Sequence, residues 1–359
     1  MKLLIGGDVV PRPVNEQYFI DGDLKTIFGE TVKLTKDADR ILINLECALT
    51  THEGIIKKFG PKLKCDPKCV NALKKFGVTD ANLANNHIFD FGEKGLRDTL
   101  ATLEGAGISY NGIGENDTDS RKPYIVEKDG EKVGVINVAE HEYSYALPNR
   151  IGANPFDPFL TMQDIREMKK LADYVIVIYH GGKEFCQYPS PRLSNLCHEM
   201  VLCGADVVLC QHSHCIGCYE EYEGGHILYG QGNFVFMGDN TTELWCTGLL
   251  VELDTKKDSI KFHPYTVNGI GIELAEGETK EEILGKFKAR SEELKNGKWK
   301  EGWAAFCESV KERYKAVLKG LETEETAENQ TERFAHYLDC EAHTDVWKEL
   351  FPTWNQTNK

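Results

Sequence analysis

Apolar residues recur along the first three quarters of the chain in short runs that alternate with amphipathic segments. The runs have the length and the β-branched content of strands, while the segments between them carry leucines at helical spacing. The strand candidates are 2–8, 40–46, 78–85, 108–114, 174–182, 206–214 and 226–236, and the helix candidates between them are 92–107, 159–172 and 191–204. Alternation of this kind predicts an α/β core built in layers.

Two further runs and the C-terminal region complete this pattern. The runs 124–139 and 248–267 each place a turn-forming centre between β-type flanks, so they predict antiparallel hairpins within a mixed sheet system. After about Gly271 the sequence becomes charged and helical, with aromatic residues able to line one helix face. We therefore expect an α/β domain over 1–270 and a helical C-terminal extension over 271–359 that packs on it.

Polar residues follow the apolar runs at nearly every predicted strand end. These residues are Asp8, Glu46, Asn85, Asn86, His87, His180, His212 and His214. In α/β sheets the loops beyond the carboxyl ends of the strands converge on one rim, where ligands bind. Carboxylate, amide and imidazole groups together suit divalent transition metals, and this number of ligands favours two ions over one.

A structural alternative applies to each histidine alone, because a histidine at a strand end is more often hydrogen-bonded than metal-bound. The spacing of His212 and His214 favours a ligand role, since residues two apart on a strand face the same side. Packing does not explain acids and imidazoles at so many strand ends, because burying them costs free energy. The joint pattern therefore indicates a metal centre.

Composition narrows the function classes. The 42 basic and 57 acidic residues give a net charge of −15, which argues against a nucleic-acid partner because phosphate contacts need a positive face. Asp8 interrupts the first apolar run, which is too short for a signal peptide or a membrane span, and no later run is long enough for a span. The 12 cysteines are then typical of reduced thiols, so we expect a cytoplasmic protein without a membrane anchor.

Two of the thiols, Cys215 and Cys218, have the C-x-x-C spacing of zinc sites. A closed zinc site needs four ligands, and the sequence offers no second pair of this kind outside the proposed cluster. Small buried thiols are the favoured interpretation.

Six motifs in a fixed order carry a resemblance to a known family. They are GGDVVPR, NLECALT, LANNHIFDFG, VIYHGGKEF, GADVVLCQHSHCI and YGQGNFVF. Together, over roughly residues 1–240, they resemble the capsule-synthesis CapA family of poly-γ-glutamate synthesis proteins (PGA_cap), a branch of the calcineurin-like metallophosphoesterase superfamily. The resemblance implies a layered sandwich of two mixed β-sheets flanked by helices. It also implies a dinuclear centre at the sheet rim that holds two divalent ions, Mn, Fe or Zn.

The same resemblance assigns roles to the strand-end residues. Glu46 looks like the carboxylate that bridges the two ions. The other ligands implied are Asp8 and His214 for one ion, and Asn86, His180 and His212 for the other. His87 is similar to the superfamily histidine that lies over the scissile group, where it protonates the leaving group or stabilises developing charge.

The chain departs from the family pattern in two places. Relatives with an Asp-x-His motif on the first strand supply a histidine where this chain has Val10, so the Asp8 site is expected to be weaker or to fill only with substrate. QHSH and HGG replace the usual GHHPH and HWG, which keeps the ligand histidines and changes the wall of the pocket.

Four more residues have candidate roles at this site. Arg12 is able to clamp an anionic group with its fork of donors, or to form a surface salt bridge. Asp90, three residues after His87, is placed to hydrogen-bond that imidazole and set its tautomer. Glu184 orients a ligand histidine or contacts substrate. Asn233 caps a turn or joins the site.

The segment 57–75 holds seven lysines and one acid in an otherwise acidic chain. A solvated loop and helix face is the favoured interpretation. The alternative is that this segment overhangs the rim and attracts a polyanion.

Two functions follow from these observations. The first is a metal-dependent hydrolase of the CapA type, which activates water against a phosphoester or a γ-glutamyl-type amide bond of a small or polymeric anionic substrate. The second is a non-catalytic accessory protein of capsule or poly-γ-glutamate synthesis that binds an anionic polymer at the same rim. The ligand set does not decide between ester and amide chemistry.

Overall fold

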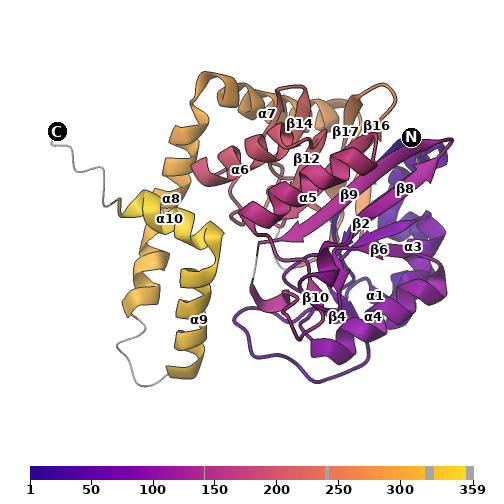
Figure 1. Cartoon of the computed structure of the whole chain (residues 1–359), viewed down its shortest axis with the longest axis horizontal. Coiled ribbons are helices and arrows are strands. Elements are labelled where there is room, and N and C mark those ends of the chain that lie inside the picture. Colours follow the sequence, from indigo (N-terminus) through magenta and orange to yellow (C-terminus); the bar gives the residue numbers. More distant parts are fainter. Residues whose placement is uncertain (141, 239–241, 320–326, 353–359) are drawn as a thin grey trace.

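Two mixed β-sheets form the centre of the molecule in a computed structural model that describes residues 1–140, 142–238, 242–319 and 327–352 (Figure 1). In spatial order the larger sheet contains β18 (Ile272–Leu274), β17 (Ser259–Val267), β16 (Thr247–Asp254), β1 (Lys2–Val10), β2 (Arg40–Leu45), β5 (Asp80–Asn82) and β6 (Ser109–Asn111), with β15 (Asn233–Phe236) also paired to β1. β1 runs parallel to β2 and antiparallel to β16, which makes the sheet mixed.

The smaller sheet has a parallel centre and antiparallel edges. Its spatial order is β13 (Tyr219–Tyr222), β14 (Gly225–Leu228), β12 (Val207–Gln211), β11 (Tyr174–His180), β9 (Glu131–Ala139) and β8 (Tyr124–Lys128). The predicted hairpins are confirmed, because β8 pairs antiparallel with β9 and β16 pairs antiparallel with β17. Two short pairs, β3 (Ala48–Leu49) with β4 (Lys64–Cys65) and β7 (Ile113–Gly114) with β10 (Gly152–Ala153), lie outside both sheets.

The two sheets pack face to face and are covered by helices on their outer faces, as the family resemblance implies. Buried aliphatic residues such as Ile5, Ile176 and Val251 fill the space between them. The helices over the larger sheet are α1 (Glu16–Asp21), α2 (Leu24–Phe28), α3 (Val70–Phe76) and α4 (Gly92–Ala106), and those over the smaller sheet are α5 (Pro158–Leu171) and α6 (Pro191–Leu202). Because both faces of each sheet are buried, the central strands are apolar on both sides.

Three strands end at positions other than those predicted. β5 covers only three residues of the expected strand 78–85, so Asn85 lies beyond it. β12 ends at Gln211, before the His-x-His pair. β1 continues past Asp8 to Val10, with an irregular register against both parallel neighbours near Asp8.

The C-terminal region contributes to the core and also forms a helical group of its own. The expected boundary after residue 270 falls just before β18, which pairs with β17 in the larger sheet. α7 (Gly277–Asn296) follows and buries Ile283 and Phe287 against the sheets. α8 (Trp299–Lys319), α9 (Ala327–Asp339) and α10 (Glu341–Leu350) then pack together at one end of the molecule, around buried Trp303 and Tyr314 (Figure 1).

Within the described ranges, none of the helices is both long enough and apolar enough to cross a lipid bilayer.

Candidate metal centre

The predicted ligands come together at one rim of the sandwich, and both sheets contribute to them. Asp8 lies in β1, Glu46 follows β2, Asn86 follows β5, His180 ends β11, and His212 and His214 follow β12. All are buried except Asn86, which is partly exposed. Side chains from five strands that are far apart in the sequence therefore surround one small volume.

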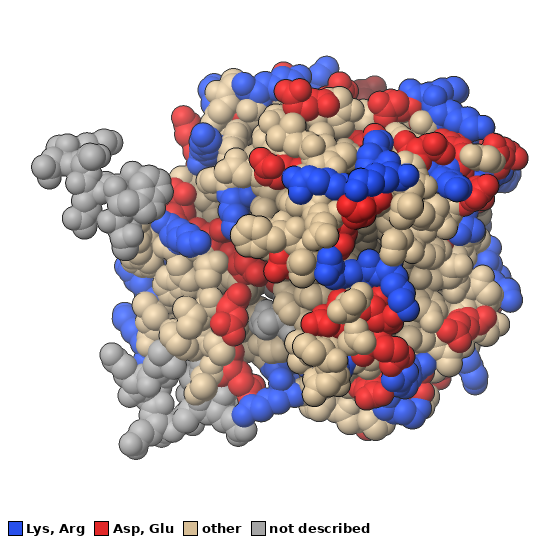
Figure 2. All heavy atoms as spheres, viewed as in Figure 1, with Lys and Arg blue, Asp and Glu red and all other residues tan. Residues whose placement is uncertain are grey.

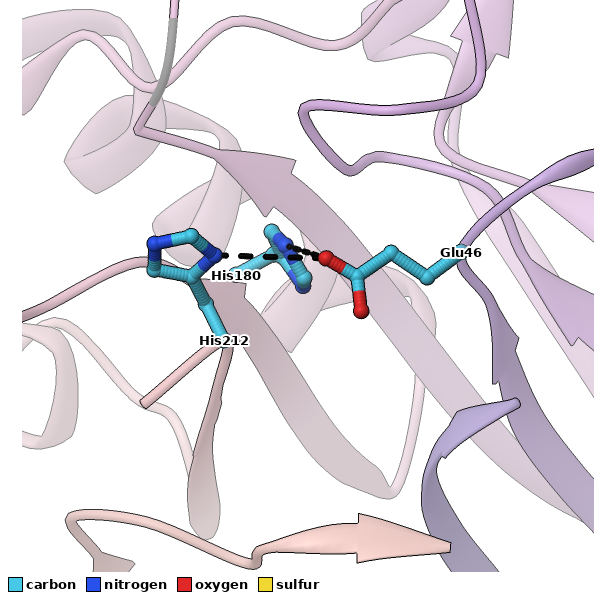
Figure 3. A group of neighbouring side chains, drawn as sticks. All are labelled: Glu46, His180 and His212. Carbon is cyan, nitrogen blue, oxygen red and sulfur yellow. Dashed lines mark ion pairs between the residues drawn. The ribbon is translucent and has the colours of Figure 1, made fainter. Parts of the chain in front are cut away.

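One group of ligands forms around Glu46 and the smaller sheet. Nε2 of His180 lies 3.2 Å from Oε1 of Glu46 and 3.0 Å from Oδ1 of Asn86. Nδ1 of His212 lies 4.0 Å from the same Glu46 oxygen, and the two imidazoles point toward the carboxylate (Figure 3). One ligand atom from each of Glu46, His180 and His212 falls within 4.8 Å of the others.

A second group shares Glu46 with the first. Nδ1 of His214 lies 3.4 Å from Oδ2 of Asp8, and ligand atoms of Asp8, Glu46 and His214 lie within 4.8 Å of one another. Glu46 is thus common to two sets of three ligands. This is the arrangement in which a carboxylate can bridge two ions.

The electrostatics of the cluster fit divalent cations. Glu46 is fully buried, and neither of its carboxylate oxygens accepts a hydrogen bond from the described residues. Burial, together with the neighbouring charge of Asp8, raises the pKa of Glu46 well above its usual value. Two adjacent buried carboxylates are costly unless cations or hydrogen bonds compensate them, and the mixed oxygen and nitrogen donors suit transition metals.

Without an ion, His214 supplies part of that compensation. Burial disfavours its charged form, but the adjacent Asp8 carboxylate and the charge of Glu46 outweigh burial and raise the pKa of His214 to about 9. His180 differs, because burial dominates and lowers its pKa to about 4. A metal ion bound by His214 would have to displace its proton.

The backbone around the His-x-His pair is strained. His212 has φ 82° and His214 has φ 55°, in the left-handed region that residues with a Cβ seldom occupy. Such residues cost roughly 1–3 kcal/mol each and persist where surrounding contacts fix them, often at functional sites. The two imidazoles do reach one cluster, but the predicted reason is wrong, because this backbone is not an extended strand.

Asn44 belongs to the site and was missed in the sequence. Its Nδ2 lies 2.7 Å from Oδ1 of Asp8 and 3.1 Å from Nδ1 of His180. Asn85 in turn donates to Oδ1 of Asn44 at 3.0 Å, which gives Asn85 a structural role beside the cluster. The available signal was an amide two residues before Glu46, on the same side of the strand predicted over 40–46.

His87 lies beside the cluster and is held by a buried ion pair. Its Nδ1 is 2.6 Å from Oδ2 of Asp90, the contact predicted from their spacing. Nζ of Lys58 donates to Oδ1 of Asp90 at 2.5 Å and to the Asn86 carbonyl at 2.9 Å. Burial and the nearby Lys58 charge lower the pKa of His87 to about 4.

Lys58 is an exception to the favoured interpretation of segment 57–75 as a solvated loop and helix face. Its side chain is 2% exposed and that of Asp90 is completely buried. Several other lysines of the segment are exposed, as expected for a solvated face. Nothing in the composition distinguishes Lys58 from them.

A cavity of about 330 Å³ opens onto the cluster. Its lining includes Asn86, His87, His212, His214 and Glu184. The carboxylate of Glu184 lies 3.7 Å from Nζ of Lys183, which also lines the cavity. The ligand cluster is therefore accessible to a small molecule from one side.

The remaining predicted residues lie in different places. Asn233 begins β15, and its Oδ1 is 2.8 Å from Nδ1 of His214, so it touches the ligand cluster directly. Arg12 lies in the turn before α1 and is not part of the described lining of the cavity, so its role stays a prediction. Cys215 and Cys218 are buried free thiols.

The fold is a two-sheet α/β sandwich, and the acids, amides and imidazoles buried at its rim include two groups of three residues that could hold a metal ion. Residues 2–237 match the model of the family described as "Bacterial capsule synthesis protein PGA_cap". That match covers more than half of the chain, so the chain belongs to this family.

Similar proteins carry related names. The chain is 34% identical over 237 residues to the "PGA biosynthesis protein CapA" of Bacillus subtilis (strain 168), covering 64% of this chain and 62% of that protein. It is 34% identical over 180 residues to the "Capsule biosynthesis protein CapA" of Bacillus anthracis, covering 48% of this chain and 44% of that protein. A "Probable polyglutamine synthesis accessory protein" of Mycobacterium tuberculosis is 29% identical over 238 residues, covering 62% of each. The chain thus spans about half to three fifths of these relatives.

Proposed function

We propose that this member of the capsule synthesis family is a metal-dependent hydrolase with a dinuclear centre. The observation that carries the proposal is Glu46, a buried carboxylate shared by two sets of three candidate ligands. His212 and His214 of these sets line the cavity. Asp8, Glu46 and His214 would hold one ion, and Glu46, Asn86, His180 and His212 the other. Two divalent ions, when bound, supply activated water and polarise the substrate oxygen near neutral pH.

The residues around the cluster would position the reacting groups. His87 lines the cavity next to the ligand Asn86, where it can exchange a proton with a leaving group. Asp90 fixes the orientation of the His87 ring, and Lys58 fixes Asp90 in turn. The substrate bond is a phosphoester or a γ-glutamyl-type amide, since the ligand set serves both.

A second candidate is an accessory protein that binds an anionic polymer without cleaving it. The printed name of the mycobacterial relative favours it, because that protein is described as an accessory protein of synthesis. Binding requires the metal centre and the cavity but not a proton donor at His87. The two candidates therefore differ in what they require of that residue.

A cytoplasmic location and an anionic substrate are parts of the same proposal. The structure places none of the 12 cysteines in a disulfide within the described ranges, as expected where thiols stay reduced. Basic and acidic side chains intermix over the face shown in Figure 2, which supports a substrate recognised in the cavity over a nucleic acid bound across that face.

The proposal is tested by metal analysis followed by a substrate screen. Protein loaded with Mn²⁺, Fe²⁺ or Zn²⁺ is assayed against aryl phosphates, phosphodiesters and short γ-glutamyl peptides. Turnover with at least one metal is expected. Bound metal without any turnover would favour the accessory function.

Replacing His87 with alanine is expected to lower kcat by about 10²- to 10⁴-fold while the metal content stays unchanged, because this residue contributes to proton transfer and not to metal binding. Steady-state kinetics and elemental analysis of the same sample measure both quantities. His52→Ala, at an exposed position, is the matched control. Unchanged turnover in His87→Ala would contradict the role assigned to this imidazole.

Replacing Asn233 with alanine is expected to weaken one of two Mn²⁺ sites by roughly 10- to 100-fold, since residues that orient metal ligands commonly contribute that much to affinity. The affected site is that of Asp8 and His214, because Asn233 contacts His214. Calorimetric titration with Mn²⁺ should then resolve one weakened and one unchanged step. Equal weakening of both steps would show that Asn233 supports the whole cluster instead.

A further inference from the structure

The C-terminal helices form the wall of the cavity that faces the ligand cluster. Asn86, His87, His212 and His214 line one side. The residues on the helical side are Arg313, His336, Tyr337, Cys340, Ala342 and His343. These positions lie after residue 237, outside the part of the chain that matches the family model. This wall is therefore not described by the family resemblance.

α9 is fixed on one edge of the cavity through the loop around Phe59. Oε1 of Glu332 pairs with Nζ of Lys57 at 3.0 Å. The His336 ring lies 5.6 Å from the Phe59 ring and is stacked on Tyr143 with centroids 5.8 Å apart. Aromatic contacts at these distances are stabilising beyond the apolar area they bury. These contacts hold α9 beside the loop that also contains Lys58. Lys58 supports His87, the proposed catalytic residue.

α10 is fixed on the opposite edge through buried charges. Asp345 accepts from Nε of Arg192 at 2.9 Å and from Oγ of Ser190 at 2.6 Å. Arg192 also pairs with Glu140, whose Oε2 accepts from the backbone N–H of Gly182 at 2.5 Å. Gly182 is itself part of the cavity lining. The helical wall is thus attached to the core on both sides of the cavity.

Arg313, an exposed residue of α8, adds a positive charge to this wall. Within the described part of the chain, no acidic side chain forms an ion pair with Arg313. The two lysines of the lining differ, because Lys58 pairs with Asp90 and Lys183 lies 3.7 Å from Glu184. A guanidinium binds carboxylate and phosphate groups through two parallel hydrogen bonds.

The size of the enclosed space limits what this pair of walls can hold. A volume of about 330 Å³ is at the lower end of the range for small-molecule sites. The metal centre and Arg313 lie on its two sides. A ligand that reaches both must be compact and must carry an anionic group at each end.

We propose that the helices α8–α10 select a compact substrate with two anionic groups, one placed at the metal centre and the other bound by Arg313. The inference rests on the proposed function, because it places the first group at the metal ions. It adds a specificity residue, Arg313, from a segment outside the family match.

The test uses the full chain loaded with Mn²⁺ and non-hydrolysable probes. Carboxyalkyl phosphonates of graded spacer length are each compared with the alkyl phosphonate of equal length by calorimetry. At the best spacer length the terminal carboxylate is expected to increase affinity roughly tenfold, which is typical of a hydrogen-bonded charge pair. Arg313→Ala should abolish this gain and leave binding of the plain alkyl phosphonate within about twofold of wild type.

The control is Lys319→Ala, which removes a positive charge from an exposed position of the same helix. This variant should keep the gain in affinity that the terminal carboxylate of the probe provides. A gain that survives in Arg313→Ala, or no gain at any spacer length, overturns the proposal. Binding of the plain phosphonate that does not depend on Mn²⁺ would instead contradict the metal centre, and the Arg313 comparison would still decide the role of the wall.

Discussion

Replacing Glu46 with glutamine is expected to remove both metal ions together and to abolish turnover. Glu46 belongs to both ligand sets, so the loss of its charge weakens two sites through one substitution. A neutral amide is a poorer ligand for a divalent ion and leaves the bridging position without charge. Elemental analysis after gel filtration and the substrate assay measure the two losses.

The free energy of unfolding distinguishes the loss of metal ions in Glu46→Gln from misfolding. In the metal-free protein, burial raises the pKa of Glu46, which marks its charge as unfavourable in the fold. The free energy of unfolding of metal-free Glu46→Gln should therefore stay level or rise by about 1 kcal/mol. Added Mn²⁺ should stabilise wild type and not the variant, because only wild type binds it. Glu292→Gln, at an exposed position of α7, is the control, and retention of both ions in Glu46→Gln would refute the bridging role.

The sequence predicted the layers of the fold because buried strands and amphipathic helices differ in period. The runs that form β2 and β11 are apolar on both faces. Strands have this pattern when both faces of their sheet are covered. Strand ends were less predictable, since pairing partners determine them. β5 pairs through only three residues, and the polar turn after it follows from contacts of Asn85 with Asn44.

The ligand cluster was predictable from polar residues that end apolar runs, and the residues that support it were not. Lys58 stands among six other lysines, and its burial depends on Asp90, 32 positions further along the chain. Glu140 follows β9 as the ligands follow their strands, yet its partner is Arg192. Local patterns carry no information about such pairs, because the fold alone brings them together.

The position of the C-terminal helices could not be predicted from the sequence either. Their amphipathic faces predicted packing, and Trp303 and Tyr314 are buried as that pattern requires. Which surface they cover depends on a few polar contacts, notably Asp345 with Arg192. An aspartate in a charged helix gives no sign that it will be buried.

Replacing Arg192 with methionine is expected to lower the free energy of unfolding by about 3–5 kcal/mol, since removing one member of a buried ion network leaves its partners uncompensated. The side chain of Glu140 is completely buried and that of Asp345 is 6% exposed. Both carboxylates would lose their cation at once. Urea unfolding of the full chain measures the change, and Arg166→Met, on the exposed face of α5, is the control.

The pH dependence of the free energy of unfolding lost in Arg192→Met identifies the physical cause of that loss. Burial already raises the pKa of Asp345 in the native protein, and the loss of Arg192 should raise it further. A carboxyl group whose pKa is higher in the folded than in the unfolded protein favours folding through its protonated form. This contribution is complete at pH values below the unfolded pKa, and it is lost as the pH rises through the folded pKa. The deficit of Arg192→Met should therefore be smaller at about pH 5 than at about pH 8. Adding Asp345→Asn should recover part of it, because one of the two charges is then gone. A deficit that is constant over this pH range would indicate lost packing instead of uncompensated charge, and α10 would then be held by its apolar contacts.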